Sequence, residues 1–197
     1  MSKDWVGSNV SAFKMIGASN HCESERENND FYATDPIAIH KLLNYESFNK
    51  NIWEYAVGMG HLSDQLANYG FNVFCSDIVN RGVENMQLID FLKTNRKFDG
   101  DIITNPPYKY CSEFILKALE VIPVGNKVAM FLKLTTLEGQ KRYEEIYSKY
   151  PPKNVYVFSK RIECAKNGKF KGESAVCYAW FIWEKGYKGE TILRWIQ

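Results

Sequence analysis

The chain has 197 residues, of which 45% are hydrophobic and 24% charged, and its formal net charge at pH 7 is +2. This length and balance are typical of a globular domain with a sizeable core, and an aromatic share of 15% excludes general disorder. The longest apolar run, residues 175–183, is shorter than the roughly 20 residues that a membrane-spanning helix needs. We therefore expect a cytoplasmic protein without a membrane partner.

Cysteine and histidine do not form a pattern that binds metal. The five cysteines are widely spread without a C-x-x-C pair, and the three histidines lack ligand spacing. We expect reduced thiols and no metal.

The predicted elements begin after a polar segment. Residues 1–30 are rich in Ser, Asn and Glu and show little periodicity, which predicts an arm or loop ahead of a single domain over 31–197. Asp35 followed by Pro36 is typical of a helix start, and apolar residues continue at helical spacing to Leu43.

Strands and helices then alternate along the chain. We expect helices over 61–68, 111–121 and after 138, and strands over 52–57, 71–76, 100–104, 127–132, 155–158 and 175–184, with a seventh strand over 191–196 beside the sixth. This order predicts an α/β three-layer sandwich, with a mainly parallel seven-stranded sheet, an antiparallel late strand and functional loops at the carboxyl ends of the strands.

A glycine pair marks the first candidate site. Gly58 and Gly60 lie between a strand and a helix, where their backbone can approach a ligand closely, and Asp77 ends the next strand, where a carboxylate can accept hydrogen bonds from ribose hydroxyls. An ordinary strand-to-helix turn is the alternative.

The second candidate is Asn105-Pro106-Pro107-Tyr108, which closes the strand over 100–104. The prolines fix the backbone, so that the Asn105 side-chain oxygen and the Pro106 carbonyl can both accept from one amino group, while Tyr108 offers a ring on which a base can stack. The alternative is a sequence that only stops a strand.

Charge is unevenly distributed. Residues 141–173 hold nine basic and four acidic residues, a local excess of five positive charges on an otherwise acidic chain. This segment is a candidate nucleic-acid contact or else a solvated face. The bases assigned to nucleic acid are Lys160, Arg161, Lys166, Lys169 and Lys171.

Together these motifs resemble class I (Rossmann-like) S-adenosylmethionine-dependent methyltransferases, specifically the small phage or prophage type that methylates adenine N6 in DNA. The resemblance extends from about Phe31 to the C-terminus and is most specific at Asn105 to Tyr108. It implies S-adenosylmethionine as cofactor and duplex DNA with a flipped adenine as partner, in a bacterial or phage-infected cell.

The resemblance also implies roles for individual residues. Gly58 and Gly60 would line the methionine moiety, Glu54 would hold the turn, and Asp77 would hold the ribose. The motif over 30–36 resembles the family's N-terminal cofactor motif. The resemblance also assigns Asp90 to the adenine amino group of the cofactor, Phe91 to the adenine ring, and Tyr32 and Thr34 to the N-terminal side of the site. The alternatives are that Asp90 caps a helix, that Phe91 belongs to the core and that Tyr32 is a surface residue.

Two features depart from the family. Tyr55 stands where the family commonly has proline, and no segment is long enough for a separate target-recognition domain, which favours relaxed or short-site specificity. Methylation of RNA or of a protein glutamine, and a catalytically silent module that binds nucleic acid or another partner, are alternative functions.

Overall fold

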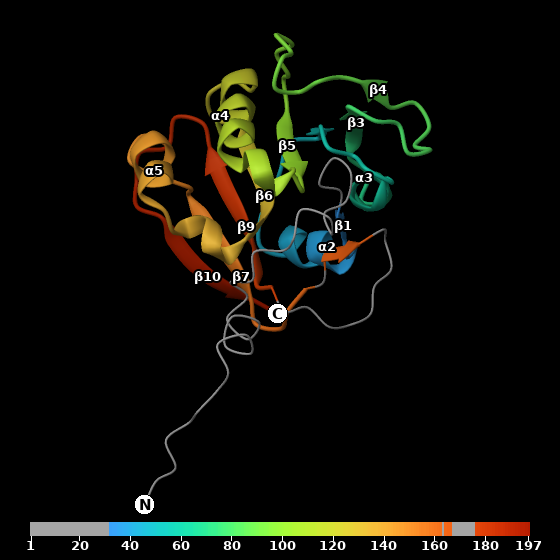
Figure 1. Ribbon diagram of the computed structural model, residues 1–197. Helices are drawn as coiled ribbons and strands as arrows, with labels where there is room; N and C mark the ends of the chain where they lie inside the picture. The colour runs from blue at the N-terminus through green and yellow to red at the C-terminus, as the bar shows by residue number, and fades with distance from the viewer. Residues whose placement is uncertain (1–31, 163, 167–175) are drawn as a thin grey trace, which may run out of the picture.

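A mixed eight-stranded sheet forms the centre of the fold (Figure 1). The computed structural model describes residues 32–162, 164–166 and 176–197. The strand order is β10-β7-β9-β6-β5-β2-β3-β4. In chain order these strands are β2 (Asn51–Glu54), β3 (Asn72–Asp77), β4 (Gln87–Leu88), β5 (Asp101–Thr104), β6 (Lys127–Lys133), β7 (Asn154–Phe158), β9 (Tyr178–Glu184) and β10 (Ile192–Ile196). Strands β2 to β6 run parallel, so their carboxyl ends meet at one edge.

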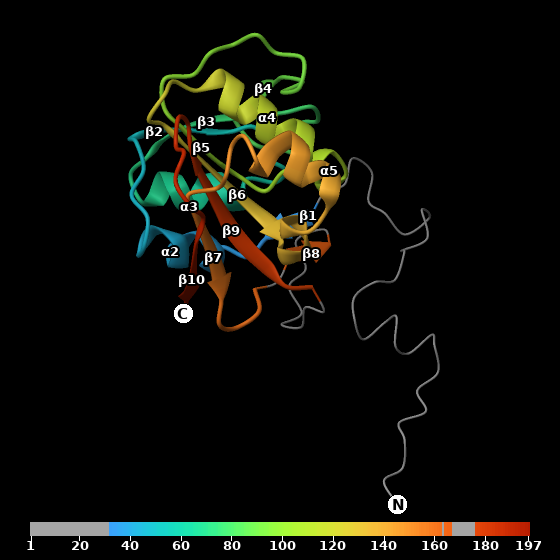
Figure 2. The same cartoon turned by 90° about the vertical axis from the view of Figure 1, so that its left-hand side faces the viewer.

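Alternating side chains supply a core on each face of the sheet. Trp53 and Ile102 belong to one buried cluster, and their neighbours Ile52 and Ile103 belong to the other. Figure 2 shows the resulting layers around the sheet. The first cluster contains side chains of α4 (Cys111–Val121) and of the π-helical turn η5 (Tyr143–Tyr147), which follows α5 (Gln140–Arg142); the second contains side chains of α2 (Ile37–Leu43) and α3 (His61–Asn68).

The sequence predicted the helices closely because each has a clear local signal. Asp35 Oδ1 accepts a hydrogen bond from the Ile37 amide at 3.0 Å, as expected of a residue that begins a helix. In α4 the apolar residues Phe114, Ile115, Ala118 and Leu119 recur at helical spacing and are all buried. The three-layer α/β class is confirmed.

The late strands differ from the prediction in one respect. Strand β9 lies between β6 and β7 and is antiparallel to both, so neither of its edges is available. The segment expected beside it, β10, therefore pairs in parallel with β7 instead, with Ile192 opposite Asn154. The sheet also has an eighth strand, β4, beyond the seven that were predicted. It consists of two exposed residues, which is too short for an alternating pattern in the sequence.

A small second sheet joins distant parts of the chain. Strand β1 (Tyr32–Thr34) pairs antiparallel with β8 (Cys164–Lys166), with Tyr32 opposite Lys166. The N-terminal motif is thus tied to the basic segment.

Among the described residues, no helix has the length and apolar character to cross a membrane.

Candidate active site

The glycine turn connects β2 to α3 at the carboxyl edge of the sheet. Gly58 and Gly60 both have positive φ angles, of 58° and 88°, which side chains disfavour. Gly60 is the residue before α3, and its amide donates to the Val57 carbonyl at 2.9 Å. The turn therefore requires glycine for its own backbone conformation, in addition to any role toward a ligand.

Asp77 ties the glycine turn to the end of β3. Its Oδ2 accepts from the Gly58 amide at 2.9 Å, and its Oδ1 accepts from the Val79 amide at 3.1 Å. The Arg81 guanidinium lies 3.6 Å from Oδ1. Asp77 is only 8% exposed, so these bonds hold a carboxylate of fixed orientation beside the turn.

Glu54 places a second carboxyl group under the same turn. It is 2% exposed, and its Oε2 has no hydrogen-bond partner among the residues that the structure describes. Burial raises the pKa of Glu54 well above its ordinary value, hydrogen bonding from Ser63 opposes this rise, and the charges of Asp77 and Asp64 add to it. A buried carboxyl oxygen without a donor fits a cationic or hydrogen-donating ligand at this turn.

The segment assigned to the cofactor's adenine follows β4. The Ile89 amide donates to the Asp77 carbonyl at 3.0 Å, which brings Asp90 beside the end of β3. Asp90 is partly exposed and forms an ion pair with Lys93 at 2.9 Å, and hydrogen bonding from Lys93 lowers the pKa of Asp90. Its Oδ1 also accepts from the Leu92 amide at 3.2 Å.

Phe91 and Tyr55 form one buried aromatic stack. Their ring centroids are 3.7 Å apart, and the Phe114 ring lies 5.2 Å from the Tyr55 ring and 6.0 Å from the Phe91 ring. Phe91 and Tyr55 are each 2% exposed. Tyr55 thus belongs to the core, where it supports the segment that contains Asp90, and the contact of Phe91 with adenine stays a prediction.

The Asn-Pro-Pro-Tyr segment lies at the end of β5, next to the glycine turn. Strand β5 pairs in parallel with β2, with Trp53 opposite Ile102, so both loops leave the same edge. Asn105 and Pro107 are half-buried and Pro106 is buried. Tyr108 begins a short 3-10 turn, η3 (Tyr108–Tyr110), so its ring lies just beyond the strand end.

Two further side chains, Tyr178 and Lys133, lie beside Tyr108 of this segment, and the sequence did not indicate them. The Tyr178 ring lies 5.9 Å from the Tyr108 ring, and the Lys133 ammonium lies 5.1 Å from the centre of the Tyr108 ring. Arg142 donates to the Thr136 carbonyl at 2.9 Å and so fixes the loop after β6.

The nucleic-acid assignments are described only in part. Lys160 and Arg161 are exposed after β7, and Lys166 ends β8. Lys169 and Lys171 lie outside the described residues, so their role stays a prediction. Of the other bases in 141–173, Lys153 forms an ion pair with Glu184 at 2.6 Å.

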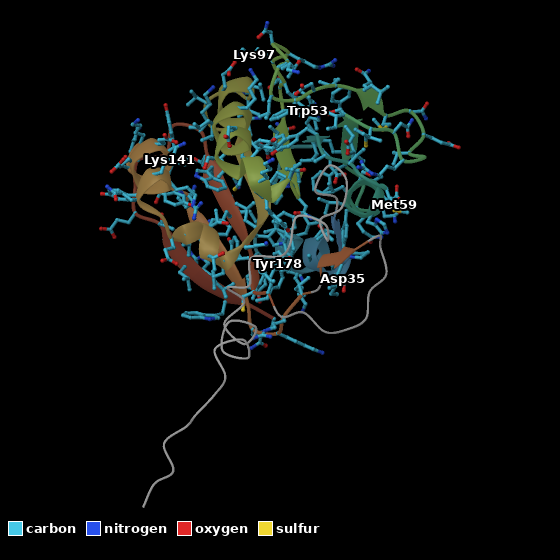
Figure 3. The ribbon with its side chains drawn as sticks, in the orientation of Figure 1. Asp35, Trp53, Met59, Lys97, Lys141 and Tyr178 are labelled. Carbon is cyan, nitrogen blue, oxygen red and sulfur yellow. The ribbon has the colours of Figure 1, made fainter. Side chains whose placement is uncertain are left out.

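Of the predicted cofactor residues, Glu54, Gly58, Gly60, Asp77, Asp90 and Phe91 therefore lie at or just after the ends of the neighbouring strands β2, β3 and β4, whereas Tyr32 and Thr34 belong to β1 of the second sheet. Figure 3 labels Met59 of the glycine turn, Asp35 beside β1 and Tyr178, all on the half of the molecule away from Lys97. Thr34, the last residue of β1, is 4% exposed. The described residues contain no group of three or more His, Cys, Asp or Glu side chains placed to hold a metal ion.

Comparison with known proteins supports the fold. No family model matches the sequence, and no curated protein matches it. A Listeria monocytogenes protein described as a class I S-adenosylmethionine-dependent methyltransferase superimposes with a TM-score of 0.57 at 13% identity, over 94% of this chain and 71% of that one.

Two further solved structures are similar. A predicted O-methyltransferase from Agrobacterium tumefaciens gives a TM-score of 0.58 at 12% identity, over 82% of this chain and 85% of that one. A Lactococcus lactis protein described as a hemolysin gives a TM-score of 0.56 at 11% identity, over 81% of this chain and 91% of that one. At these identities the likeness shows the fold: the chain has the Rossmann-like fold of class I methyltransferases.

Proposed function

We propose that this protein transfers a methyl group from S-adenosylmethionine to the exocyclic N6 amino group of adenine in DNA. The observation that carries the proposal is the position of Asn105-Pro106-Pro107-Tyr108. This segment follows β5, whose parallel neighbour β2 leads into the glycine turn. The candidate amino-group segment and the candidate cofactor turn thus follow neighbouring strands, which supports the proposal.

The residues at this edge fit S-adenosylmethionine. The fixed carboxylate of Asp77 suits two ribose hydroxyls, and each of its oxygens retains acceptor capacity beyond its one backbone bond. The unpartnered Oε2 of Glu54 suits the positive methionine end. Asp90 has the exposure to accept from an amino group of the cofactor's adenine.

The reaction requires placement and activation of an amino nitrogen. Bound S-adenosylmethionine supplies a methyl group on a positively charged sulfur. The Asn105 side-chain oxygen and the Pro106 carbonyl accept the two amino hydrogens, which directs the nitrogen lone pair toward that methyl group. The nitrogen–carbon bond forms as the sulfur–carbon bond breaks, and the surplus proton on nitrogen leaves to solvent.

Tyr108 supports the choice of a nucleobase as the target. Its ring is half-buried and lies beside Tyr178, so it is held in place and retains exposed surface. A base that has left the duplex can stack on such a ring. This contact distinguishes a nucleobase from the amide of a protein glutamine, which has no extended ring to stack.

Transfer of a labelled methyl group tests the proposal. Purified protein is incubated with radiolabelled S-adenosylmethionine and, separately, with plasmid DNA, RNA and protein extract. We expect label in DNA. Label only in RNA or protein would replace the substrate, and cofactor binding without any transfer would favour a silent binding module.

A further inference from the structure

Lys133 is the last residue of β6, and its position relates it to the target site. Thr104 of β5 pairs with Met130 of β6. Lys133 is three residues beyond Met130, just as Pro107 is three residues beyond Thr104, so the two neighbouring strands bring Lys133 alongside the Asn-Pro-Pro-Tyr segment.

The ammonium of Lys133 lies over the ring of Tyr108. The distance from Nζ to the ring centre is 5.1 Å. Lys133 is directly opposite Tyr178 in the β6–β9 pair, so their side chains share one face of the sheet. Tyr178 in turn stacks on Phe131 at 5.0 Å. The lysine therefore projects from a rigid base, although its own four-carbon stem is flexible.

Lys133 forms no ion pair with any carboxylate of residues 32–162, 164–166 and 176–197. Two other half-buried lysines at the sheet have such a partner: Lys127, at the opposite end of β6, contacts Glu46 at 2.6 Å, and Lys153 contacts Glu184 at 2.6 Å. A cation held only by an aromatic ring in a water-accessible place is weakly bound. Its charge remains available to an anion that approaches Tyr108.

We propose that Lys133 binds the DNA phosphate next to the adenine that stacks on Tyr108. This inference rests on the proposed function, because a nucleotide on Tyr108 brings its own phosphate to the neighbourhood of that ring. A charged ammonium donates strongly to a phosphate oxygen, which outweighs the contact with the ring. A protein glutamine would bring no such anion.

Charge removal at Lys133 tests the contact. Lys133→Met keeps most of the apolar stem, and Lys133→Arg keeps the charge. Lys50→Met is the matched control, because Lys50 is exposed just before β2, at the opposite edge of the sheet. Thermal melting of each variant verifies folding, and titration with S-adenosylhomocysteine verifies the cofactor site.

The decisive measurement is affinity for a fluorescent adenine-rich duplex at several salt concentrations. For Lys133→Met we expect affinity about tenfold weaker at low salt and a plot of log affinity against log salt that is shallower by about 0.9, the value for one lost phosphate contact. Lys133→Arg and Lys50→Met should keep the wild-type slope.

The outcomes separate this inference from the proposed function. If wild-type protein methylates DNA and Lys133→Met keeps the wild-type slope, Lys133 does not bind phosphate, even if transfer becomes slower through a changed Tyr108. If the wild-type protein methylates only RNA or protein, the proposed function is wrong, and the contact of Lys133 with a DNA phosphate is then excluded as well.

Discussion

Replacement of Asp77 by asparagine separates its role in the fold from its role toward the cofactor. Asp77 accepts hydrogen bonds from two backbone amides, those of Gly58 and Val79. Asparagine has one acceptor oxygen, so its NH2 group must face one of these amides. The change should therefore leave one buried N–H group without a partner.

The structure gives the size of the effect and a control. Loss of one hydrogen bond to a charged group costs about 1.5–3 kcal/mol in free energy of unfolding. Asp101 is 3% exposed at the opposite edge and accepts from the amides of Asn49 at 2.6 Å and Lys127 at 2.7 Å. Asp101→Asn should destabilise the protein by a similar amount.

Only Asp77→Asn should affect the cofactor. We expect its affinity for S-adenosylhomocysteine, measured by calorimetry, to be at least about tenfold weaker, because about 1.4 kcal/mol corresponds to tenfold. Asp101→Asn should bind normally. Equal affinity in both variants, together with equal loss of stability, would refute the reasoning and leave Asp77 only as a residue that holds the turn.

Three other changes probe the core, the buried carboxyl group and the basic segment. Tyr55→Ala should lower the free energy of unfolding in urea by about 3–5 kcal/mol because it empties a stacked position. Tyr55→Phe should cost less than about 1 kcal/mol, since within the described part of the chain the hydroxyl has only a long contact to the Met130 sulfur, at 3.9 Å, as a hydrogen bond. Equal losses would contradict this. The pKa of Glu54 is higher in the fold than its unfolded value near 4.5, so its contribution to stability is fully present below pH 4.5 and is lost as the pH rises through the folded pKa. Glu54→Gln cannot ionise, so it should lack this loss of stability and have a higher melting temperature than the wild type at neutral pH. A lower melting temperature of Glu54→Gln at neutral pH would count against this. If both lysines contact phosphate, Lys166→Ala with Lys169→Ala should make the salt dependence of DNA affinity shallower by up to about 1.8, and an unchanged slope would exclude this segment as the DNA surface.

The sequence predicted what is encoded locally. The helix over 61–68 follows from the turn at Gly60 and a short apolar stripe, and it coincides with α3. The end of β5 followed from apolar residues that stop at Asn105. Asp77 was placed beside the glycine turn because neighbouring parallel strands end at the same edge.

Features that depend on distant contacts could not be predicted. Tyr55 and Phe91 are 36 positions apart in the sequence, and only the folded chain stacks their rings. Strand β10 pairs with β7 because both edges of β9 are already paired, one with β6 and one with β7. Lys133 meets Tyr108 because β5 and β6 are in register, which no local pattern reveals.

Identification of the methylated nucleoside tests the central claim most directly. DNA treated with S-adenosylmethionine and either wild-type protein or Asn105→Ala is digested to nucleosides and analysed by mass spectrometry. We predict N6-methyldeoxyadenosine with the wild type and none with the variant, although both bind S-adenosylhomocysteine equally. Methylation at another position, or unimpaired methylation by Asn105→Ala, would contradict the account.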